Sequence, residues 1–282
     1  MTTTTTTHPL NLVDIGLVEV TVDERGEGRP FLLLHGGGGP DTMRTFAELF
    51  ANSYPARVIT PIHPGFGGTP RPTELRTIRE LAALYVALLD QLELSDITVV
   101  GNSIGGWIAA ELGLLESPRV SGVILVDAVG IEVPGHPIAD FFSLSMDQVF
   151  ELGFHDPTAF RIDPASLLPA AQMIMAGDRS ALAAYAGTSM CDPGLIERLS
   201  AMEAPTLVLW GDSDRIVDPE YGRAYAAAIP TARFQLLGAT GHLPQLETPG
   251  QLLQVIRNYA DTDFSNSPTH SVAAAQGRRA TS

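Results

Sequence analysis

The chain has 282 residues, of which 45% are hydrophobic and 17% charged, and its formal net charge is −15 at pH 7. This composition excludes a chain that is disordered throughout, and the acidic balance argues against nucleic acid or an anionic membrane as a partner, because both need a basic face. The one cysteine, Cys191, excludes an internal disulfide, and no apolar run approaches the roughly 20 residues of a membrane span. The sequence therefore predicts a soluble, cytoplasmic protein that handles small molecules.

Short apolar strands alternate with helical segments along most of the chain. Residues 1–10 include a threonine run and are predicted to form a disordered tail. Strands are predicted at 15–22, 31–34, 57–61, 97–100, 120–126, 206–210 and 233–237, and helices at 42–52, 77–94, 221–229 and 249–260. This alternation predicts an α/β fold with a mostly parallel central sheet and right-handed crossovers.

The pattern changes between residues 134 and 204, where no strong strand run occurs and short, helical pieces carry large apolar side chains. We expect an inserted helical cap here, with the core formed by residues 11–133 and 205–263. From residue 264 the chain is rich in Ser, Thr, Ala and Arg. Residues 264–282 are therefore predicted to form a second disordered tail.

The strand at 97–100 runs directly into a Gly-x-Ser-x-Gly motif centred on Ser103, and a small apolar helical segment follows. A serine at such a strand-to-helix turn adopts a strained backbone, and the glycines two residues before and after it remove colliding Cβ atoms. The pattern predicts that the Ser103 hydroxyl stands clear at the carboxyl end of the sheet.

Three candidate catalytic residues each follow a predicted strand, in the order Ser103, Asp214, His242. A serine hydroxyl needs a base within hydrogen-bond reach, which a histidine supplies, and a carboxylate on the other ring nitrogen fixes the tautomer. Asp214 is the preferred carboxylate. Asp212, two residues earlier, and Asp127, after the preceding strand of the core, remain alternatives.

A run of four glycines follows the strand at 31–34 and His35. Acyl transfer at Ser103 would create an oxyanion that needs fixed donors about 3 Å away. We expect the backbone N–H of Ile104 to be one donor and that of Gly37, or of Gly38, to be the other. His35 is expected to bond backbone and shape this loop, and His63 to have a structural role.

Several motifs in a fixed order carry a resemblance to a known family. They are Leu34-His35-Gly36-Gly37, Pro64-Gly65-Phe66-Gly67, Gly101-Asn102-Ser103-Ile104-Gly105-Gly106, Trp210-Gly211-Asp212-Ser213-Asp214 and Gly241-His242. Together they resemble the α/β-hydrolase superfamily over roughly residues 17–261, which implies the α/β-hydrolase fold and the triad Ser103, Asp214 and His242.

Within that superfamily, the Gly-Asn-Ser motif and the glycine-rich loop resemble carbon–carbon bond hydrolases of aromatic ring-fission products. Two features depart from that group. Leu243 stands directly after His242, where the group carries tryptophan, and the arginine that the group uses to hold the substrate carboxylate is not identified. Arg161, Arg179 and Arg198 are the candidates.

The substrate pocket and its cofactors are the remaining expectations about the site. Pocket residues are expected to be Gly38, Asn102, Phe141, Phe142, Met146 and Leu243. No metal is expected, because His8, His136, His155 and His270 have no histidine or carboxylate at ligand spacing. No cofactor is expected either.

The sequence thus predicts a cofactor-free serine hydrolase that cleaves a small, largely apolar carboxylic ester through an acyl-enzyme. Three alternatives remain: a carbon–carbon bond hydrolase, a cofactor-free haloperoxidase or perhydrolase, and a non-enzymatic small-molecule receptor of the same fold. The family's epoxide hydrolases and haloalkane dehalogenases are disfavoured, because both use an aspartate where Ser103 stands. The oligomeric state is left open.

Overall fold

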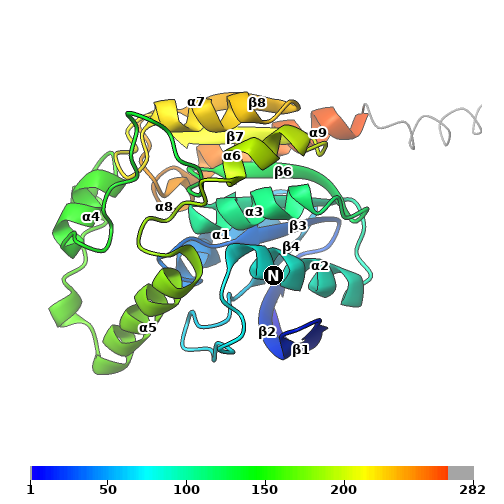
Figure 1. The fold of residues 1–282 in the computed structure, drawn as a ribbon, viewed down its shortest axis with the longest axis horizontal. Helices are drawn as coiled ribbons and strands as arrows, with labels where there is room; N and C mark the ends of the chain where they lie inside the picture. Colours follow the sequence, from blue (N-terminus) through cyan, green and yellow to red (C-terminus); the bar gives the residue numbers. More distant parts are fainter. Residues whose placement is uncertain (1, 266–282) are drawn as a thin grey trace, which may run out of the picture.

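A computed structural model describes residues 2–265, in which eight strands form one sheet (Figure 1). Their order across the sheet is β1-β2-β4-β3-β5-β6-β7-β8. The pairs β1·β2 and β2·β4 are antiparallel and all others are parallel. The strands are β1 Thr4–Leu12, β2 Gly16–Arg25, β3 Arg29–Leu34, β4 Ala56–Pro61, β5 Ile97–Asn102, β6 Val120–Val126, β7 Thr206–Gly211 and β8 Ala232–Leu237. The predicted α/β fold with a mostly parallel sheet is confirmed.

The prediction of a disordered tail at residues 1–10 was wrong, because Thr4–Leu12 forms the edge strand β1. β1 pairs with β2 along its whole length, from Thr4 opposite Glu24 to Leu12 opposite Gly16. Threonine is β-branched and suits a strand that has one solvated face, and the ladder with β2 satisfies the backbone groups on that side of the strand. Leu10 is buried and anchors the strand to the core. Low sequence complexity was therefore a misleading signal here.

Helices cover both faces of the sheet (Figure 1). Phe31 and Leu33 of β3 pack with α1 and α9 on one face, while Leu32 and Leu34 pack with α2 and α3 on the other. This alternation follows from the two-residue period of a strand that is buried on both faces. The helices of this part are α1 Asp41–Ser53, α2 Ile78–Gln91, α3 Ile104–Leu114, α7 Pro219–Ala228, α8 Pro244–Glu247 and α9 Pro249–Ser265.

The segment predicted as a cap, residues 134–204, consists of short helices and loops. They are α4 Met146–Gly153, η1 Pro157–Ala159, η2 Pro164–Ser166, α5 Pro169–Ala186, α6 Leu195–Arg198 and η3 Leu199–Ala201. We call this range the cap segment. Its helices α4 and α5 lie beyond one end of the strands, apart from the helices that flank the sheet (Figure 1).

One face of α5 packs on two glycine-rich loops of the sheet. The Asp178 carboxylate accepts the Gly67 N–H at 2.8 Å, and the Tyr185 hydroxyl donates to the Pro64 carbonyl at 2.9 Å. A Cβ atom on Gly37 would lie 2.8 Å from a methyl carbon of Leu182, so the helix approaches the loop as closely as bare backbone allows. The cap segment thereby contacts the loop expected to hold the oxyanion.

The predicted second tail, residues 264–282, lies outside the described residues from 266 onwards. Residues 264 and 265 belong to α9, which extends further than the predicted 249–260. Within residues 2–265, none of the helices has the length and apolar character that crossing a membrane requires.

Candidate active site

Ser103 lies at the turn between β5 and α3 with φ 57° and ψ −119°, a backbone conformation that costs free energy for any residue other than glycine. Its N–H donates to the Val126 carbonyl at 3.0 Å, which ties the turn to β6. The turn requires glycine at 105, because a Cβ atom there would collide with the backbone oxygen of Leu34. The strained strand-to-helix turn therefore has the geometry that the sequence predicts.

His242 and Asp214 form a buried pair. The Nδ1 atom of His242 lies 2.7 Å from Oδ2 of Asp214, whose side chain is fully buried. The backbone N–H groups of Ile216 and Val217 donate to Oδ1 of Asp214 at 2.8 and 3.2 Å. A carboxylate oxygen accepts hydrogen bonds, so the contact with Asp214 places a proton on Nδ1 of His242 and leaves Nε2 as the nitrogen that can accept one.

The other two candidate carboxylates serve backbone groups. Asp212 accepts the N–H groups of Ala239 and Thr240 at 3.1 and 3.3 Å. Asp127 accepts the Gly211 N–H at 2.8 Å. Of the three aspartates, Asp214 alone has a hydrogen bond to His242 within the described part of the chain.

The glycine loop lies directly beside Ser103. A Cβ atom on Gly36 would stand 3.1 Å from Cβ of Ser103, and Gly37 and Gly38 line the same cavity as Ser103. Ile104 is the first residue of α3, so its N–H has no acceptor within the helix. Within residues 2–265, no hydrogen bond uses the N–H of Gly37 or Ile104.

A buried histidine pair holds this loop in place. The His35 ring donates from Nδ1 to the Gly36 carbonyl at 2.8 Å and accepts the His63 N–H at Nε2, 3.2 Å away. The His63 ring stacks on it with 3.7 Å between centroids and accepts a short hydrogen bond from the Tyr85 hydroxyl. Burial lowers the pKa of His35 to about 4 and that of His63 well below its ordinary value, so both rings are neutral at pH 7. The expectation that His35 shapes the loop is confirmed.

A cavity of about 640 Å³ lies between the cap segment and the sheet, and it contains Ser103 and His242 in its wall. Of the expected pocket residues, Gly38, Asn102, Phe141, Met146 and Leu243 line it. Phe142 does not; its ring packs edge-on against Phe141 at 5.6 Å. The cavity wall also contains apolar residues that the sequence did not predict there: Leu144, Val149, Phe154, Phe160, Ile162, Leu182, Ile216 and Leu246.

Asn102 lines the cavity beside Ser103, but its side-chain amide is already hydrogen-bonded within the protein. The Nδ2 group donates to the carbonyls of Val126 and His242 at 3.2 and 2.9 Å, and Oδ1 accepts from Gln245 at 3.0 Å. Asn102 therefore positions the segment that carries His242. A spacing pattern could not have identified this role, because the contacts span 140 and 143 residues.

Of the three candidate arginines, Arg179 lines the cavity. Its Nη2 group donates to the carbonyls of Phe141 and Phe142 at 3.2 and 2.7 Å. Arg161 instead pairs with Asp147 and Glu151. The neighbouring Asp178, which the sequence analysis did not single out, also lines the cavity.

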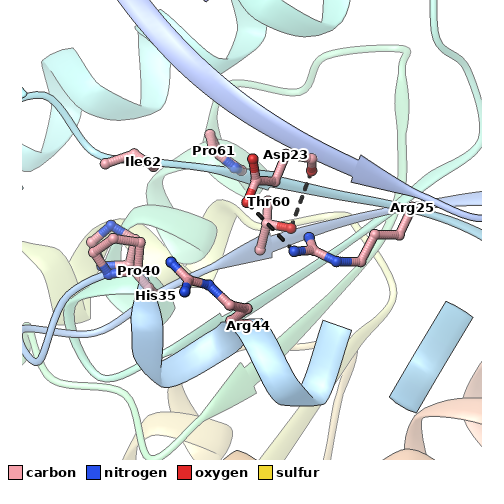
Figure 2. Close-up of a pocket in the computed structure, with 8 residues that line it drawn as sticks. All are labelled: Asp23, Arg25, His35, Pro40, Arg44, Thr60, Pro61 and Ile62. Atoms are coloured by element: carbon pink, nitrogen blue, oxygen red, sulfur yellow. Dashed lines mark hydrogen bonds and ion pairs between the residues drawn. The ribbon is translucent and has the colours of Figure 1, made fainter. Parts of the chain in front are cut away.

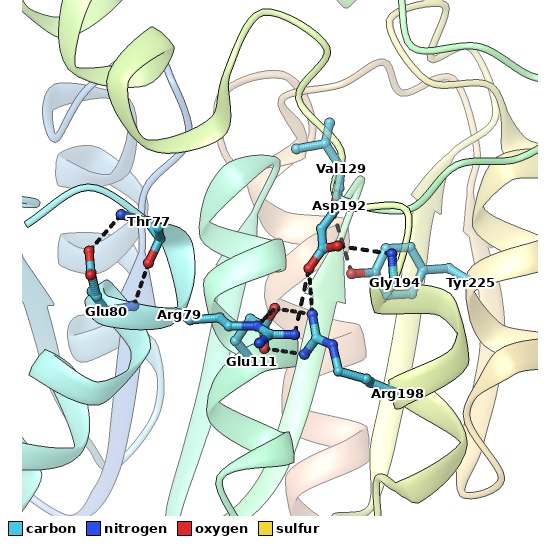
Figure 3. A network of polar contacts seen from close by, with 9 residues as sticks. All are labelled: Thr77, Arg79, Glu80, Glu111, Val129, Asp192, Gly194, Arg198 and Tyr225. Carbon is cyan, nitrogen blue, oxygen red and sulfur yellow. Dashed lines mark hydrogen bonds and ion pairs between the residues drawn. The ribbon is translucent and has the colours of Figure 1, made fainter.

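Arg198 belongs to a polar network with Arg79, Glu111 and Asp192 (Figure 3). It donates two hydrogen bonds of 2.7 Å to the Glu111 carboxylate and one of 2.7 Å to Asp192. Arg79 lies 3.6 Å from Glu111 and 3.7 Å from Asp192. The network joins α2 and α3 to the end of the cap segment, which explains why Arg198 does not reach the cavity.

A second, much smaller cavity of about 30 Å³ lies behind His35 (Figure 2). Arg25 and Arg44 extend toward it from β2 and α1, with Asp23 at its wall (Figure 2). Its volume has room for one or two water molecules and no substrate. Within the described residues there is no group of three or more His, Cys, Asp or Glu side chains that could hold a metal ion.

Comparison with known proteins agrees with this geometry. The model of the alpha/beta hydrolase family matches residues 31–255, so the chain belongs to the α/β hydrolase family and is a hydrolase. A 2-hydroxymuconate semialdehyde hydrolase of Pseudomonas putida is 30% identical, with 86% of this chain and 92% of that protein covered.

Two solved structures share the fold. A thermophilic esterase from Thermogutta terrifontis has a TM-score of 0.73 and 26% identity, covering 92% of this chain and 99% of that one. A meta-cleavage product hydrolase from Pseudomonas fluorescens has a TM-score of 0.71 and 21% identity, with 86% and 94% covered. The predicted resemblance to the family and to its carbon–carbon bond hydrolases is confirmed.

Proposed function

We propose that the protein is a serine hydrolase that cleaves a small, largely apolar carboxylic ester. Ser103 attacks the ester carbonyl, Nε2 of His242 takes the hydroxyl proton and returns it to the leaving alcohol, and Asp214 stabilises the imidazolium that forms. Water, activated by the same histidine, then hydrolyses the acyl-enzyme. The observation that carries the proposal is the 2.7 Å contact between Asp214 and a histidine that shares a cavity wall with Ser103.

The backbone N–H groups of Gly37 and Ile104 are the proposed oxyanion donors. Their hydrogen-bonding capacity is unused among the described residues, and both flank Ser103. Ile104 N–H also lies at the N-terminus of α3, where the helix dipole favours negative charge. Losing one such donor typically costs about 3 kcal/mol of transition-state stabilisation.

The apolar wall of the cavity supports the substrate class. Apolar side chains make up most of it, with phenylalanine, methionine and leucine the most frequent, and a volume of about 640 Å³ suits a small acyl compound. The few polar groups are concentrated near Ser103 and on α5. An ester with an aliphatic or aromatic acyl group therefore fits better than a highly polar substrate.

The second candidate is carbon–carbon bond hydrolysis of an aromatic ring-fission product. Two observations favour it: the 30% identity to 2-hydroxymuconate semialdehyde hydrolase, and the position of Arg179 in the cavity wall, where its remaining N–H groups could hold a substrate carboxylate. Leu243 in place of tryptophan after His242 is the feature that departs from that chemistry.

A cytoplasmic location and the absence of a cofactor stay predictions from the sequence.

A labelling experiment tests the nucleophile. A fluorophosphonate probe should label the intact protein, and Ser103→Ala should abolish labelling, whereas Ser200→Ala, which removes an exposed serine of η3, should not. Labelling that persists in Ser103→Ala would refute the assignment. A series of p-nitrophenyl esters of rising chain length, compared by kcat/KM with a ring-fission dienoate, then decides between the two candidate reactions.

A further inference from the structure

Asp127 is a buried acidic residue at the carboxyl end of β6 that the proposed mechanism does not use. Its backbone has φ 46°, in the left-handed region that residues other than glycine adopt rarely. Its N–H donates to the Leu209 carbonyl at 3.0 Å, and its Oδ1 atom accepts the Gly211 N–H at 2.8 Å. The side chain is thereby fixed between β6 and β7, the strand that leads to Asp214.

The second oxygen of this carboxyl group, Oδ2, is buried and receives no N–H or O–H donor from the described residues. The charged groups that act on Asp127 are Asp214 and Glu247, both of them negative, and Asp214 also acts through a side-chain hydrogen bond. Burial first, and the charge of Asp214 next, raise the pKa of Asp127 well above its ordinary value. Two adjacent buried carboxylates would repel each other strongly, which favours a proton on one of them.

The hydrogen-bond donors decide which residue holds that proton. Asp214 accepts from two backbone N–H groups, those of Ile216 and Val217, and from the His242 ring. Asp127 accepts from the N–H of Gly211 alone. Donors stabilise the ionised form, so Asp127, which has fewer of them, is the residue of the pair where the neutral form is favoured, and its unpartnered Oδ2 atom is the site that a proton would occupy.

We propose that Asp127 is a neutral carboxylic acid whose O–H donates to Asp214, and that it is a positioning residue for the Asp214–His242 pair. The proton supplies the fourth hydrogen bond that a carboxylate can accept, which fixes the Asp214 side chain in the orientation that His242 needs. It also leaves a single negative charge beside His242. The positioning role rests on the proposed function, whereas the presence of the proton does not.

Two substitutions separate these statements. Asp127→Asn keeps one acceptor for the Gly211 N–H and one donor for Asp214, so kcat/KM toward the best p-nitrophenyl ester should stay near the wild-type value. Asp127→Ala removes both and should lower kcat by about 10- to 100-fold, the usual effect of losing a hydrogen bond to a charged group, with little change in KM. Equal losses in the two variants, both with wild-type thermal unfolding, would overturn the positioning role.

The acidic limb of the pH–rate profile gives a second readout. This limb reports protonation of His242, whose basicity depends on the charges around it. If Asp127 is neutral, Asp127→Asn leaves the limb where it is. If Asp127 is ionised, the substitution removes a negative charge close to the Asp214–His242 pair and moves the limb to lower pH, which would overturn the proposal.

Infrared spectroscopy tests the proton without any activity. The wild-type protein at pH 7 should show the carbonyl stretch of a protonated carboxylic acid, and Asp127→Asn should lose it. A wild-type spectrum without that band would refute the neutral acid. If the protein fails to react with fluorophosphonate yet shows the band, the proposed function fails while the protonation of Asp127 stands.

Discussion

Because His35 and His63 are buried as neutral rings, we expect the free energy of unfolding of the protein to fall in mild acid. Both rings lie at zero or near-zero exposure behind the glycine loop, and both are held neutral by burial. At His35 the Nε2 atom accepts the His63 N–H, so a proton on that nitrogen would replace an attraction by a repulsion between two donors. Protonation therefore requires this part of the structure to open.

The pKa of His35 gives the size and the sign of the effect. Burial lowers this pKa from 6.5 to about 4, so the unfolded chain binds a proton over a pH range in which the folded chain does not. The stabilising contribution is complete above pH 6.5 and is lost as the pH falls toward 4. At about 1.4 kcal/mol for each pKa unit, the whole window corresponds to about 3 kcal/mol, of which about 2 kcal/mol is lost between pH 7 and pH 4.5. His63 changes stability in the same direction.

Urea unfolding at a series of pH values measures this contribution. The wild-type free energy of unfolding should fall more steeply between pH 7 and pH 4.5 than that of His35→Asn, which lacks the titrating ring. The control is His155→Gln, because His155 is exposed and its replacement should leave the slope unchanged. Parallel curves of unfolding free energy against pH for wild type and His35→Asn would refute the reasoning. If that variant does not fold, NMR titration of the histidine rings in the wild-type protein replaces the test. The reasoning is then refuted if none of the rings titrates with a pKa near 4.

The remaining predictions concern glycine positions and the polar network. Gly105→Ala should abolish a stable fold or lower the melting temperature sharply, because the new Cβ collides with the backbone oxygen of Leu34. Gly177→Ala should instead raise the free energy of unfolding by about 0.5 to 1 kcal/mol, because Gly177 lies within α5 and its Cβ would meet open space. Thermal unfolding of both variants checks this, and equal melting temperatures would contradict it. Glu111→Leu leaves Arg198 partly buried without its bidentate partner and should destabilise by about 3 kcal/mol in urea unfolding, with KM for the ester unchanged. A change in KM larger than the change in stability would argue for a direct role in the site.

The sequence by itself determined the parts of this protein that rest on local rules. The apolar strand runs predicted seven of the eight strands of the described sheet, and the Gly-x-Ser-x-Gly motif and the position of Asp214 and His242 after later strands predicted the order of the candidate residues. Steric exclusion of a Cβ atom at Gly101, which would meet the backbone oxygen of Gly105, is a property of a short segment, and so is the two-residue period of a strand. For this reason they could be predicted without knowledge of the packing.

The tertiary structure decided what depends on partners distant in sequence. The threonine run forms a strand because it pairs with β2, and Phe142 packs edge-on against Phe141 outside the cavity wall. The side chain of Asn102 bonds groups 24, 140 and 143 residues away, a set of contacts that no local pattern encodes. Burial and hydrogen bonding, which set the roles of such residues, are sums over neighbours that only the folded chain brings together.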